Sequence, residues 1–372
     1  MRVIFTCGGT AGHVNPALAL AGYIKEKQPD AQVLFVGTPD GMERSLVEKS
    51  GYAFRGVEIS NFHRSFAPAE IAHNLHTLKT MVTSRRQAKE ILRSFQPDLA
   101  VGTGGYASYP IIRAAARAGV PTAVHESNIV PGLTTKLLEP YAGRIMVGFE
   151  ECRQHYRHPE KVAVTGTPVR GEFFALSREQ ARQKLGLEDG RPLVVSFWGS
   201  LGASLMNEKM LDFFRRARMD GQPFHHVHAV GSRSWDSVHQ TMAAEGLDQT
   251  PRLDVREYIH DMPLLMCAAD LVICRAGAST VSEITALGVP AVIVPSPYVT
   301  NDHQDKNARA LERAGGAVVL REKECTGSSL YDAVCGILAD DGRRAAMGRA
   351  MASLGIRDAS DRIYETLMKL VR

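Results

Sequence analysis

The chain has 372 residues, of which 44% are hydrophobic and 23% are charged, and its formal net charge at pH 7 is +4. This length is too great for one ordinary hydrophobic core and suits two domains of roughly 150 to 200 residues each. The composition is that of a globular protein, and the small net charge gives no reason to expect nucleic acid as a partner.

Short apolar runs alternate with helical patterns along the first half of the chain. Strands are expected at 2–7, 32–37, 98–102, 121–125, 143–148 and 161–165, with helices near 15–28, 69–95 and 107–118. This alternation predicts a parallel, doubly wound α/β sheet.

The same alternation restarts after the Gly and Pro residues near 165–175, with strands near 192–198, 224–230, 270–274, 290–294 and 316–320. We therefore expect two Rossmann-like parallel-sheet domains, at 1–168 and 169–351, and a final helix at about 352–372 that packs back on the first domain. Because parallel sheets bind ligands at the carboxyl ends of their strands, the ligand is expected in a cleft between the domains.

Two glycine-rich turns, 7–13 and 197–203, each join an expected strand to an expected helix. Glycines let the backbone approach a phosphate closely, and the N–H groups of the following helix attract anions. The first turn has neither the G-x-G-x-x-G spacing of dinucleotide sites nor the lysine of a Walker loop, which disfavours NAD and ATP. Two such half-sites in one chain suggest one ligand bound between two domains.

His13 ends the first turn, and Pro16 is expected in the first turn of the helix that follows. In that place His13 could act as a base or as a hydrogen-bond donor to a bound ligand. The alternative is a histidine that only caps the helix.

A further glycine loop at 102–110 also leads from a strand to a helix. It either holds a second diphosphate at the helix N-terminus, or its glycines only relieve crowding. Two diphosphates in one enzyme would indicate transfer between two activated substrates.

The segment 125–128 places polar side chains at the carboxyl end of a buried strand. In one interpretation Glu126 is a general base and Asn128 binds a sugar hydroxyl. In the other, Glu126 is a buried carboxylate that ties loops together.

In the second half, 274–283 runs from a strand into a helix whose first amides and hydroxyls suit an anion. Glu283 follows in the second turn, either as the acceptor of two ribose hydroxyls or as a solvated surface residue. The amides and hydroxyls at 297–308 suit the face of a sugar, and this segment has no metal-ligand spacing.

The six cysteines include no C-x-x-C pair, which predicts reduced thiols in a cytoplasmic protein and no structural metal. No apolar run reaches the roughly 20 residues of a membrane span, and no signal peptide is recognised. We therefore expect a protein that is neither exported nor transmembrane.

Together these segments resemble the MurG family of bacterial N-acetylglucosaminyltransferases, which belong to glycosyltransferase family 28 and have the GT-B fold. The motifs follow one another along nearly the whole chain: Gly9-Thr10-Ala11-Gly12-His13 with Asn15-Pro16, Gly104-Gly105-Tyr106, His125-Glu126-Ser127-Asn128, Pro168-Val169-Arg170, Gly199-Ser200-Leu201-Gly202-Ala203, Arg275-Ala276-Gly277-Ala278 with Ser282-Glu283, and His303-Gln304 with Asn307-Ala308. The resemblance implies inverting transfer of N-acetylglucosamine from UDP-GlcNAc to the muramyl 4-hydroxyl of lipid I, the undecaprenyl-diphosphate-linked MurNAc-pentapeptide. The product would be lipid II of peptidoglycan synthesis, made without a cofactor or a protein-bound metal.

The resemblance also implies roles for single residues. His13 is the first candidate for the catalytic base and Glu126 the second. The acceptor diphosphate would be held by Gly9, Gly104, Gly105 and Tyr106. The UDP-GlcNAc site would consist of Thr10, Ala11, Gly12, Asn128, Arg170, Ser200, Ile259, Ala278, Ser279, Thr280, Val281, Ser282, Glu283 and Gln304, with the Ile259 backbone on uracil and Glu283 on the ribose.

Four residues depart from the family's usual pattern. Ala11 stands where a second glycine is usual, Ser127 where glutamine is usual, Thr167 where asparagine is usual, and Leu201 where a polar or basic residue is common. None removes a proposed catalytic group, so we interpret them as lineage variation.

The lipid-linked acceptor implies a peripheral protein on the cytoplasmic face of the cell membrane, with other cell-wall synthesis proteins as candidate partners. The segment 61–95 favours docking on anionic lipid, because it combines Phe62, Phe66, Ile71, Leu75, Leu78 and Val82 with Arg64, Lys79, Arg85, Arg86, Lys89 and Arg93. The alternative is that its apolar stripe is the core face of an ordinary helix.

Three other functions stay open at this point. Glycolipid synthases share the fold and differ in acceptor, and UDP-GlcNAc 2-epimerases share the donor but have no use for a second diphosphate loop. A nucleotide-sugar-binding subunit without activity is the third.

Overall fold

The computed structural model describes residues 1–59, 68–199, 201–299 and 302–371; the side chains of Ala11 and of residues 68–79, 81 and 82 also lie outside the described part. The chain divides into two compact units. The N-terminal unit comprises Met1–Val169 and Ile356–Arg372, and the C-terminal unit comprises Arg170–Gly355.

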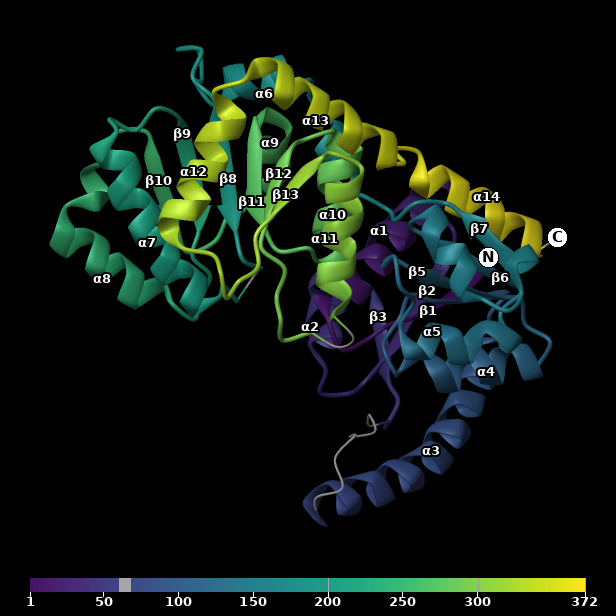
Figure 1. The fold of residues 1–372 in the computed structure, drawn as a ribbon. Coiled ribbons are helices and arrows are strands. Elements are labelled where there is room, and N and C mark those ends of the chain that lie inside the picture. The colour runs from purple at the N-terminus through teal and green to yellow at the C-terminus, as the bar shows by residue number, and fades with distance from the viewer. Residues whose placement is uncertain (60–67, 200, 300–301, 372) are drawn as a thin grey trace. The chain divides into compact units, whose positions relative to one another are not determined.

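The N-terminal unit is built on a seven-stranded parallel sheet with the order β3-β2-β1-β4-β5-β6-β7 (Figure 1). The strands are β1 Arg2–Thr6, β2 Gln32–Gly37, β3 Ala53–Gly56, β4 Leu99–Gly102, β5 Thr122–Glu126, β6 Arg144–Val147 and β7 Val162–Val164. The order reverses between β1 and β4, which makes the carboxyl ends of these two strands a topological switch point.

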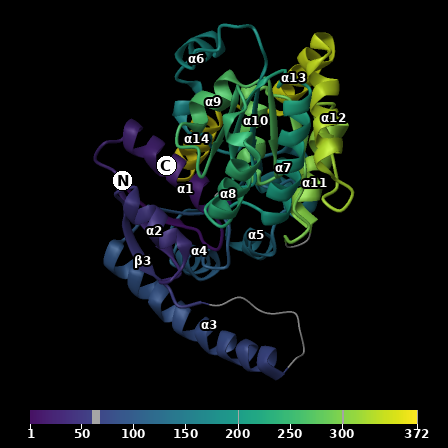
Figure 2. The ribbon, with the colours of Figure 1, turned by 90° about the vertical axis from the view of Figure 1, so that its left-hand side faces the viewer.

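Helices cover both faces of this sheet because its central strands are apolar on both sides. Ile4 and its neighbours pack against α3 (Pro68–Phe95) and α4 (Ser108–Arg117), which lie along one face (Figure 2). Val3 and Phe5, one residue to either side, point to the opposite face and pack against α1 (Ala11–Lys27). The unit also contains α2 (Met42–Lys49) and α5 (Leu133–Leu138).

The last helix, α14 (Ala359–Val371), packs on the same face as α1. Ile363 and Leu367 are one turn apart and fully buried, so this helix contributes its apolar stripe to the N-terminal core. The Gln28 amide donates a hydrogen bond of 2.8 Å to the Tyr364 hydroxyl, and the Tyr23 hydroxyl donates one to Asp361.

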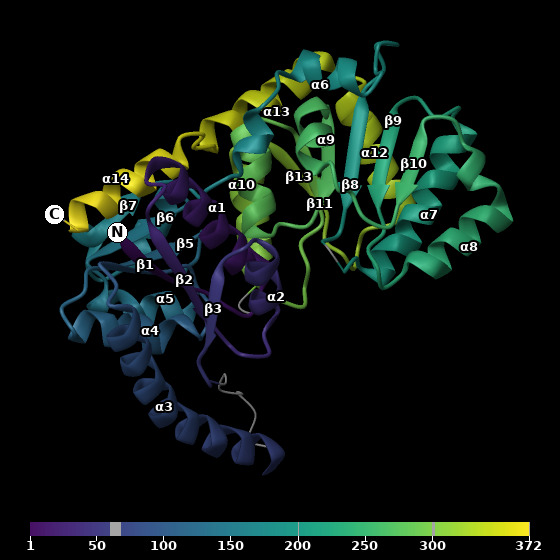
Figure 3. The ribbon, with the colours of Figure 1, turned by 180° about the vertical axis from the view of Figure 1, so that it is seen from behind.

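The C-terminal unit repeats the architecture with six parallel strands in the order β10-β9-β8-β11-β12-β13. They are β8 Leu193–Phe197, β9 His225–Ala229, β10 Leu253–Arg256, β11 Leu271–Cys274, β12 Ala291–Ile293 and β13 Ala317–Val319. Its helices are α6 Arg178–Lys184, α7 Ser204–Met219, α8 Trp235–Glu245, α9 Met262–Ala268, α10 Ala278–Leu287, α11 His303–Arg313, α12 Gly327–Leu338 and α13 Asp341–Leu354 (Figures 1 and 3). Here the strand order reverses between β8 and β11.

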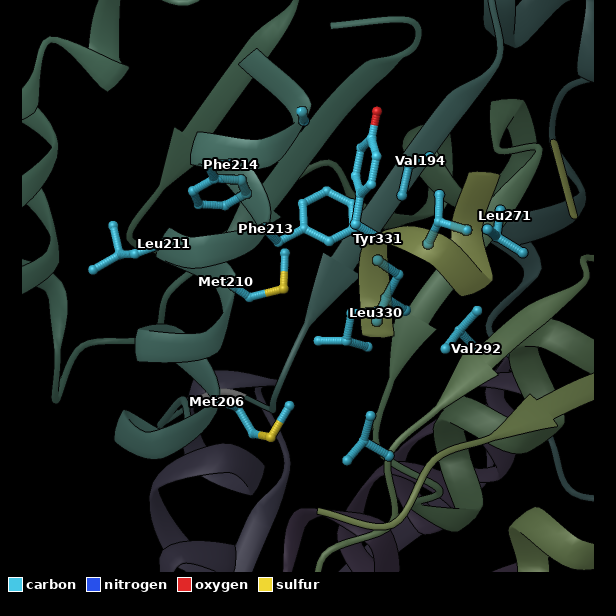
Figure 4. Close-up of a cluster of buried hydrophobic side chains, with 14 of the residues drawn as sticks. Val194, Met206, Met210, Leu211, Phe213, Phe214, Leu271, Val292, Leu330 and Tyr331 are labelled. Atoms are coloured by element: carbon cyan, nitrogen blue, oxygen red, sulfur yellow. The ribbon is translucent and has the colours of Figure 1, made fainter. Parts of the chain in front are cut away.

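The main core of this unit lies between the sheet and the helices α7, α8 and α12. Figure 4 shows Phe213 and Phe214 of α7 close to Tyr331 of α12, with Val194 and Leu271 of the sheet nearby. The Phe213 and Tyr331 rings meet edge to face with their centroids 5.4 Å apart, a favoured aromatic geometry. This packing holds the two central strands in place.

The sequence predicted this fold class correctly: both sheets are parallel, and every predicted strand lies within one residue of an observed strand at each end. Two strands were missed, β3 and β10, because they are edge strands with largely exposed or half-exposed residues and lack an apolar run. The prediction for Pro16 was wrong. Helix α1 already begins at Ala11, because the Val14 N–H donates to the Thr10 carbonyl (3.3 Å), so Pro16 lies in the second turn.

Candidate functional site

Each sheet presents one pair of glycine-containing loops at its switch point. In the N-terminal unit these loops follow β1 and β4, and in the C-terminal unit they follow β8 and β11. Such loops line the crevice in which open parallel sheets bind their ligands. The strand order alone therefore indicates candidate binding regions at the ends of β1 and β4 and at the ends of β8 and β11.

His13 is fixed by the loop that precedes it. Its Nδ1 lies 2.9 Å from the Gly8 carbonyl oxygen and 3.3 Å from the Thr10 hydroxyl. A carbonyl can only accept, so Nδ1 carries the proton and donates to Gly8. In the neutral ring the other nitrogen, Nε2, is then unprotonated and can accept a proton from a ligand.

The glycine loop after β4 packs directly against His13 and Gly8. A Cβ on Gly104 would lie 2.5 Å from His13 Cδ2, and one on Gly105 would lie 2.1 Å from the Gly8 carbonyl oxygen. Both glycines also have left-handed backbones, with φ of +111° and +80°. The Thr103 hydroxyl donates a 2.7 Å hydrogen bond to the His13 carbonyl. These glycines leave room for the histidine, which gives them a structural reason beside the predicted role in diphosphate binding.

Glu126 ties together the loop after β5. Oε1 accepts hydrogen bonds from the Asn128 backbone (3.0 Å) and side-chain amide (2.9 Å), and Oε2 accepts from Gly132 N–H (2.9 Å) and the Thr135 hydroxyl (2.8 Å). The residue is 4% exposed. Four donors therefore occupy both oxygens of this carboxylate and hold them toward its own loop. These hydrogen bonds agree with the loop-tying interpretation of Glu126, and the assignment of the base to His13 stays a prediction.

Glu126→Gln is expected to destabilise the protein by about 1–3 kcal/mol, because the new amide group opposes at least one of these donors. Urea unfolding measures this, with the exposed Glu150→Gln as a control that should change stability by no more than ~0.5 kcal/mol. A fully stable Glu126→Gln protein that had lost turnover would instead assign the base to Glu126.

His125 lies beneath the same loop and contacts both Ser127 and Gly166. It is buried, and its Nε2 lies 2.9 Å from the Gly166 carbonyl oxygen, to which it donates. Burial lowers the pKa of this imidazole, so the ring is neutral. Ser127 then donates its hydroxyl to His125 Nδ1 over 3.3 Å.

In the C-terminal unit, Glu283 on α10 is an unusual carboxylate. Burial raises its pKa to about 7, and the positive charge of Arg170 opposes that rise. Its side chain makes no hydrogen bond with another described residue, unlike Glu126. A part-buried carboxylate without donors suits a ligand that brings its own hydroxyl groups.

The N-terminus of α10 offers a place for an anion. Ala278, Ser279 and Thr280 form the first turn, whose N–H groups have no partner within a helix. The Ser279 Oγ is buried and has no hydrogen-bond partner in the described chain. Together with the helix dipole, these groups can hold a phosphate.

Two other predicted residues of this helix already make hydrogen bonds within it. The Val281 N–H already donates to the Gly277 carbonyl (2.9 Å), and its side chain is fully buried. The Ser282 hydroxyl donates to the Ala278 carbonyl (2.9 Å). The helix itself uses these groups, and a contact of Val281 or Ser282 with UDP-GlcNAc stays a prediction.

The other predicted donor residues have varied surroundings. Gln304 at the start of α11 accepts the Ser296 N–H through Oε1 (2.9 Å), which leaves its amide N–H groups to meet a sugar hydroxyl. Ile259 is 3% exposed, so a contact with uracil would go through its backbone. Arg170 is exposed and stacks over Phe173 at 5.5 Å. Ser200 and the side chain of Ala11 lie outside the described residues.

The remaining departures differ in their effect. Thr167 is buried with its hydroxyl unpartnered among the described residues, whereas Leu201 is 54% exposed beside the glycine loop after β8. In that loop, a Cβ on Gly202 would lie 2.0 Å from the Val230 carbonyl oxygen. The loop is thus held against the end of β9, and the leucine leaves that backbone contact intact.

Sequence reasoning missed one residue at this site. Glu43, in the first turn of α2, is fully buried and contacts the glycine turn after β1. The sequence around Glu43 is typical of a surface helix with an acidic first turn. It therefore does not indicate a contact with Gly9, which lies 34 residues away in the chain.

Residues 3–147 match the glycosyltransferase family 28 N-terminal domain and residues 193–363 match the family 28 C-terminal domain. A UDP-N-acetylglucosamine–N-acetylmuramyl-(pentapeptide) pyrophosphoryl-undecaprenol N-acetylglucosamine transferase of Acetivibrio thermocellus is 40% identical over 372 residues, which cover 100% of this chain and 99% of the relative.

Solved structures agree. The crystal structure of Acinetobacter baumannii MurG has a TM-score of 0.76 and 26% identity, covering 99% of both chains. UDP-GlcNAc 2-epimerase from Neisseria meningitidis, bound to UDP-GlcNAc, has a TM-score of 0.66 and 15% identity, covering 99% of this chain and 100% of its own, a likeness in fold alone. The chain belongs to glycosyltransferase family 28, the family that includes MurG and whose GT-B fold its two parallel sheets share.

Proposed function

We propose that the protein transfers N-acetylglucosamine from UDP-GlcNAc to the muramyl 4-hydroxyl of lipid I and thereby forms lipid II for peptidoglycan synthesis. The observation that carries this proposal is the full-length relative of 40% identity, whose name states this transfer. The chain contains the groups that the reaction needs: His13, whose Nε2 can accept a proton, and Glu283, whose carboxylate can accept hydrogen bonds from hydroxyl groups.

The donor belongs to the C-terminal unit in this proposal. The carboxylate of Glu283 accepts the two ribose hydroxyls, and the first turn of α10 and the Arg170 guanidinium meet the diphosphate. Charge that develops on the leaving UDP is stabilised by these preorganised donors. Gln304 reads the sugar through its amide.

The acceptor belongs to the N-terminal unit. His13 Nε2 takes the proton of the 4-hydroxyl as its oxygen attacks the anomeric carbon, and the bond from that carbon to the UDP oxygen breaks. A single displacement converts the α-linked donor into a β-1,4-linked product. Gly9, Gly104, Gly105 and Tyr106 lie around the His13 loop and are proposed to hold the acceptor diphosphate.

The membrane-bound acceptor makes peripheral attachment at the cytoplasmic face of the membrane part of this proposal. The described part of α3 buries Ala88, Ile91 and Leu92 in the core and exposes a basic face with Arg85, Arg86, Lys89 and Arg93. This face can attract anionic lipid. Phe62 and Phe66 and the side chains of Ile71, Leu75, Leu78 and Val82 lie outside the described residues, and association with other cell-wall proteins stays a prediction.

Within the described residues, no helix is long and apolar enough to cross a membrane.

A test against the epimerase alternative uses the donor alone. Purified protein is incubated with UDP-GlcNAc in deuterated water and followed by proton NMR. A transferase is expected to leave the sugar C2 configuration unchanged and to incorporate no deuterium there, because no step of the displacement breaks the C2–H bond. Appearance of the C2 epimer would replace the proposed function.

A further inference from the structure

Glu43 is a buried carboxylate that the transfer reaction described above does not use. Oε1 accepts hydrogen bonds from the Thr38 N–H (2.8 Å) and hydroxyl (2.6 Å) at the end of β2, and Oε2 accepts from the Gly9 N–H at 3.4 Å. Its side chain is completely buried. Burying a carboxylate costs free energy unless hydrogen-bond donors compensate for the lost water, so a buried carboxylate calls for an explanation.

The surrounding backbone is shaped to admit this carboxylate. A Cβ on Gly8 would lie 2.7 Å from Glu43 Oε1, one on Gly37 would lie 2.6 Å from Cγ, and one on Gly41 would lie 2.3 Å from Oε2. Gly8 of the turn after β1 and two glycines between the end of β2 and the start of α2 thus leave space for one side chain. Such convergence at a single acid goes beyond what a tie between β2 and α2 needs, because Thr38 alone supplies that tie.

One peptide group joins Glu43 to His13. The Gly9 N–H that points to Glu43 and the Gly8 carbonyl that accepts from His13 Nδ1 belong to the same peptide bond. The N–H and C=O of a trans peptide point in opposite directions. The carboxylate therefore lies on one side of this peptide group and the imidazole on the other, in a chain of two hydrogen bonds.

From this geometry we infer that Glu43 is a positioning residue for His13. Its negative charge orients and polarises the Gly8–Gly9 peptide, which strengthens the carbonyl as acceptor for Nδ1–H. The ring is held in the tautomer with a free Nε2, and the positive charge that His13 gains with the substrate proton is stabilised. A serine-protease triad uses its aspartate on the histidine in the same manner, without the intervening peptide.

This inference rests on the proposed transferase function, so its test needs a measurement that does not depend on turnover. Histidine ring ¹⁵N NMR reports the tautomer of His13 directly, and the His13→Asn variant identifies its signals. Wild-type protein is expected to show the Nδ1–H form. Glu43→Gln, which keeps the size of the side chain and removes its charge, is expected to shift His13 toward a mixture of both tautomers.

Kinetics then separate positioning from mere structure. Glu43→Gln is expected to lower kcat at least 10-fold, with the KM for UDP-GlcNAc and the affinity for UDP changed less than twofold. Glu43→Asp, which keeps the charge on a shorter side chain, should recover part of kcat. Thr38→Val is the matched control, since it removes one hydrogen bond from Oε1 and leaves Gly9 untouched, and it should keep the wild-type tautomer and kcat.

Two results would overturn the inference. One is an unchanged His13 tautomer in Glu43→Gln, and the other is an equal loss of kcat in Glu43→Gln and Thr38→Val that follows their thermal stability. If Glu43→Gln does not fold, Glu43→Asp decides by the same ¹⁵N signals. Absence of transfer by the wild-type protein, with the tautomer shift still present, would refute the proposed function and leave the Glu43–His13 link in place.

Discussion

Glu283→Gln is expected to weaken the binding of UDP and UDP-GlcNAc by roughly 10- to 100-fold, the size of a lost hydrogen bond to a charged group. An amide accepts through one oxygen only and carries no negative charge, so its hydrogen bonds to the two ribose hydroxyls are weaker than those of the carboxylate. Isothermal titration calorimetry at pH 8 measures the effect. The exposed Glu324→Gln, on the same unit, is the control and should bind as the wild type does.

The same substitution is expected to stabilise the protein without ligand above pH 7. Burial raises the pKa of Glu283 from an ordinary 4.5 to about 7, so the folded state binds a proton more tightly than the unfolded state. The stability that this proton contributes is fully present below about pH 4.5 and is lost as the pH rises through 7. At pH 8, removing the charge is expected to raise the free energy of unfolding by at most about 3 kcal/mol. The gain should fall below this limit because the side chain is partly exposed to solvent.

Unfolding at two pH values tests the sign. The gain in stability of Glu283→Gln over the wild type should be larger at pH 8 than at pH 5. A variant that is less stable than the wild type at pH 8 would show that the carboxylate has a partner in the folded protein, and the ribose role would lose its physical basis.

His13→Asn is expected to lower kcat by about 10²- to 10⁴-fold, the usual contribution of a general base. The asparagine amide can still donate to the Gly8 carbonyl in place of Nδ1, so the glycine turn keeps its shape, but nothing replaces Nε2. Steady-state kinetics with saturating substrates measure kcat, and calorimetry with UDP is expected to show unchanged affinity.

The exposed His158→Asn, on the same unit, is the matched control for His13, because it makes the same exchange of side chains away from the glycine turns and should cost little activity. Near-normal turnover of His13→Asn would contradict the assignment. In that case Glu126, despite its four hydrogen-bond donors, would be the remaining candidate.

The fold was predictable because its strands are short apolar runs buried on both faces, a pattern that depends on local sequence alone. The edge strands β3 and β10 were not predicted, because their largely exposed or half-exposed residues do not form an apolar run. The start of α1 at Ala11 was not predicted, because Pro16 suggested a later start. In the structure, the hydrogen bond from the Val14 N–H to the Thr10 carbonyl forms the first turn before Pro16.

The site was predictable as a set of loops but not in its contacts. Gly104 and Gly105 were recognised as a loop after a strand, yet their closeness to His13 and Gly8 joins segments more than 90 residues apart. The same holds for Glu43 and for the donors around Glu126, since a sequence shows a carboxylate but not its hydrogen-bond partners. Burial of Glu283 likewise follows from tertiary packing.

The most direct test of the proposed function is a transfer assay. Purified protein is incubated with UDP-GlcNAc and a short-chain lipid I analogue, and UDP release and product mass are followed together. Each UDP released is expected to be matched by one acceptor heavier by one N-acetylhexosamine residue. Release of UDP with an unchanged acceptor, or no turnover by a protein that still binds the donor, would contradict the proposed function.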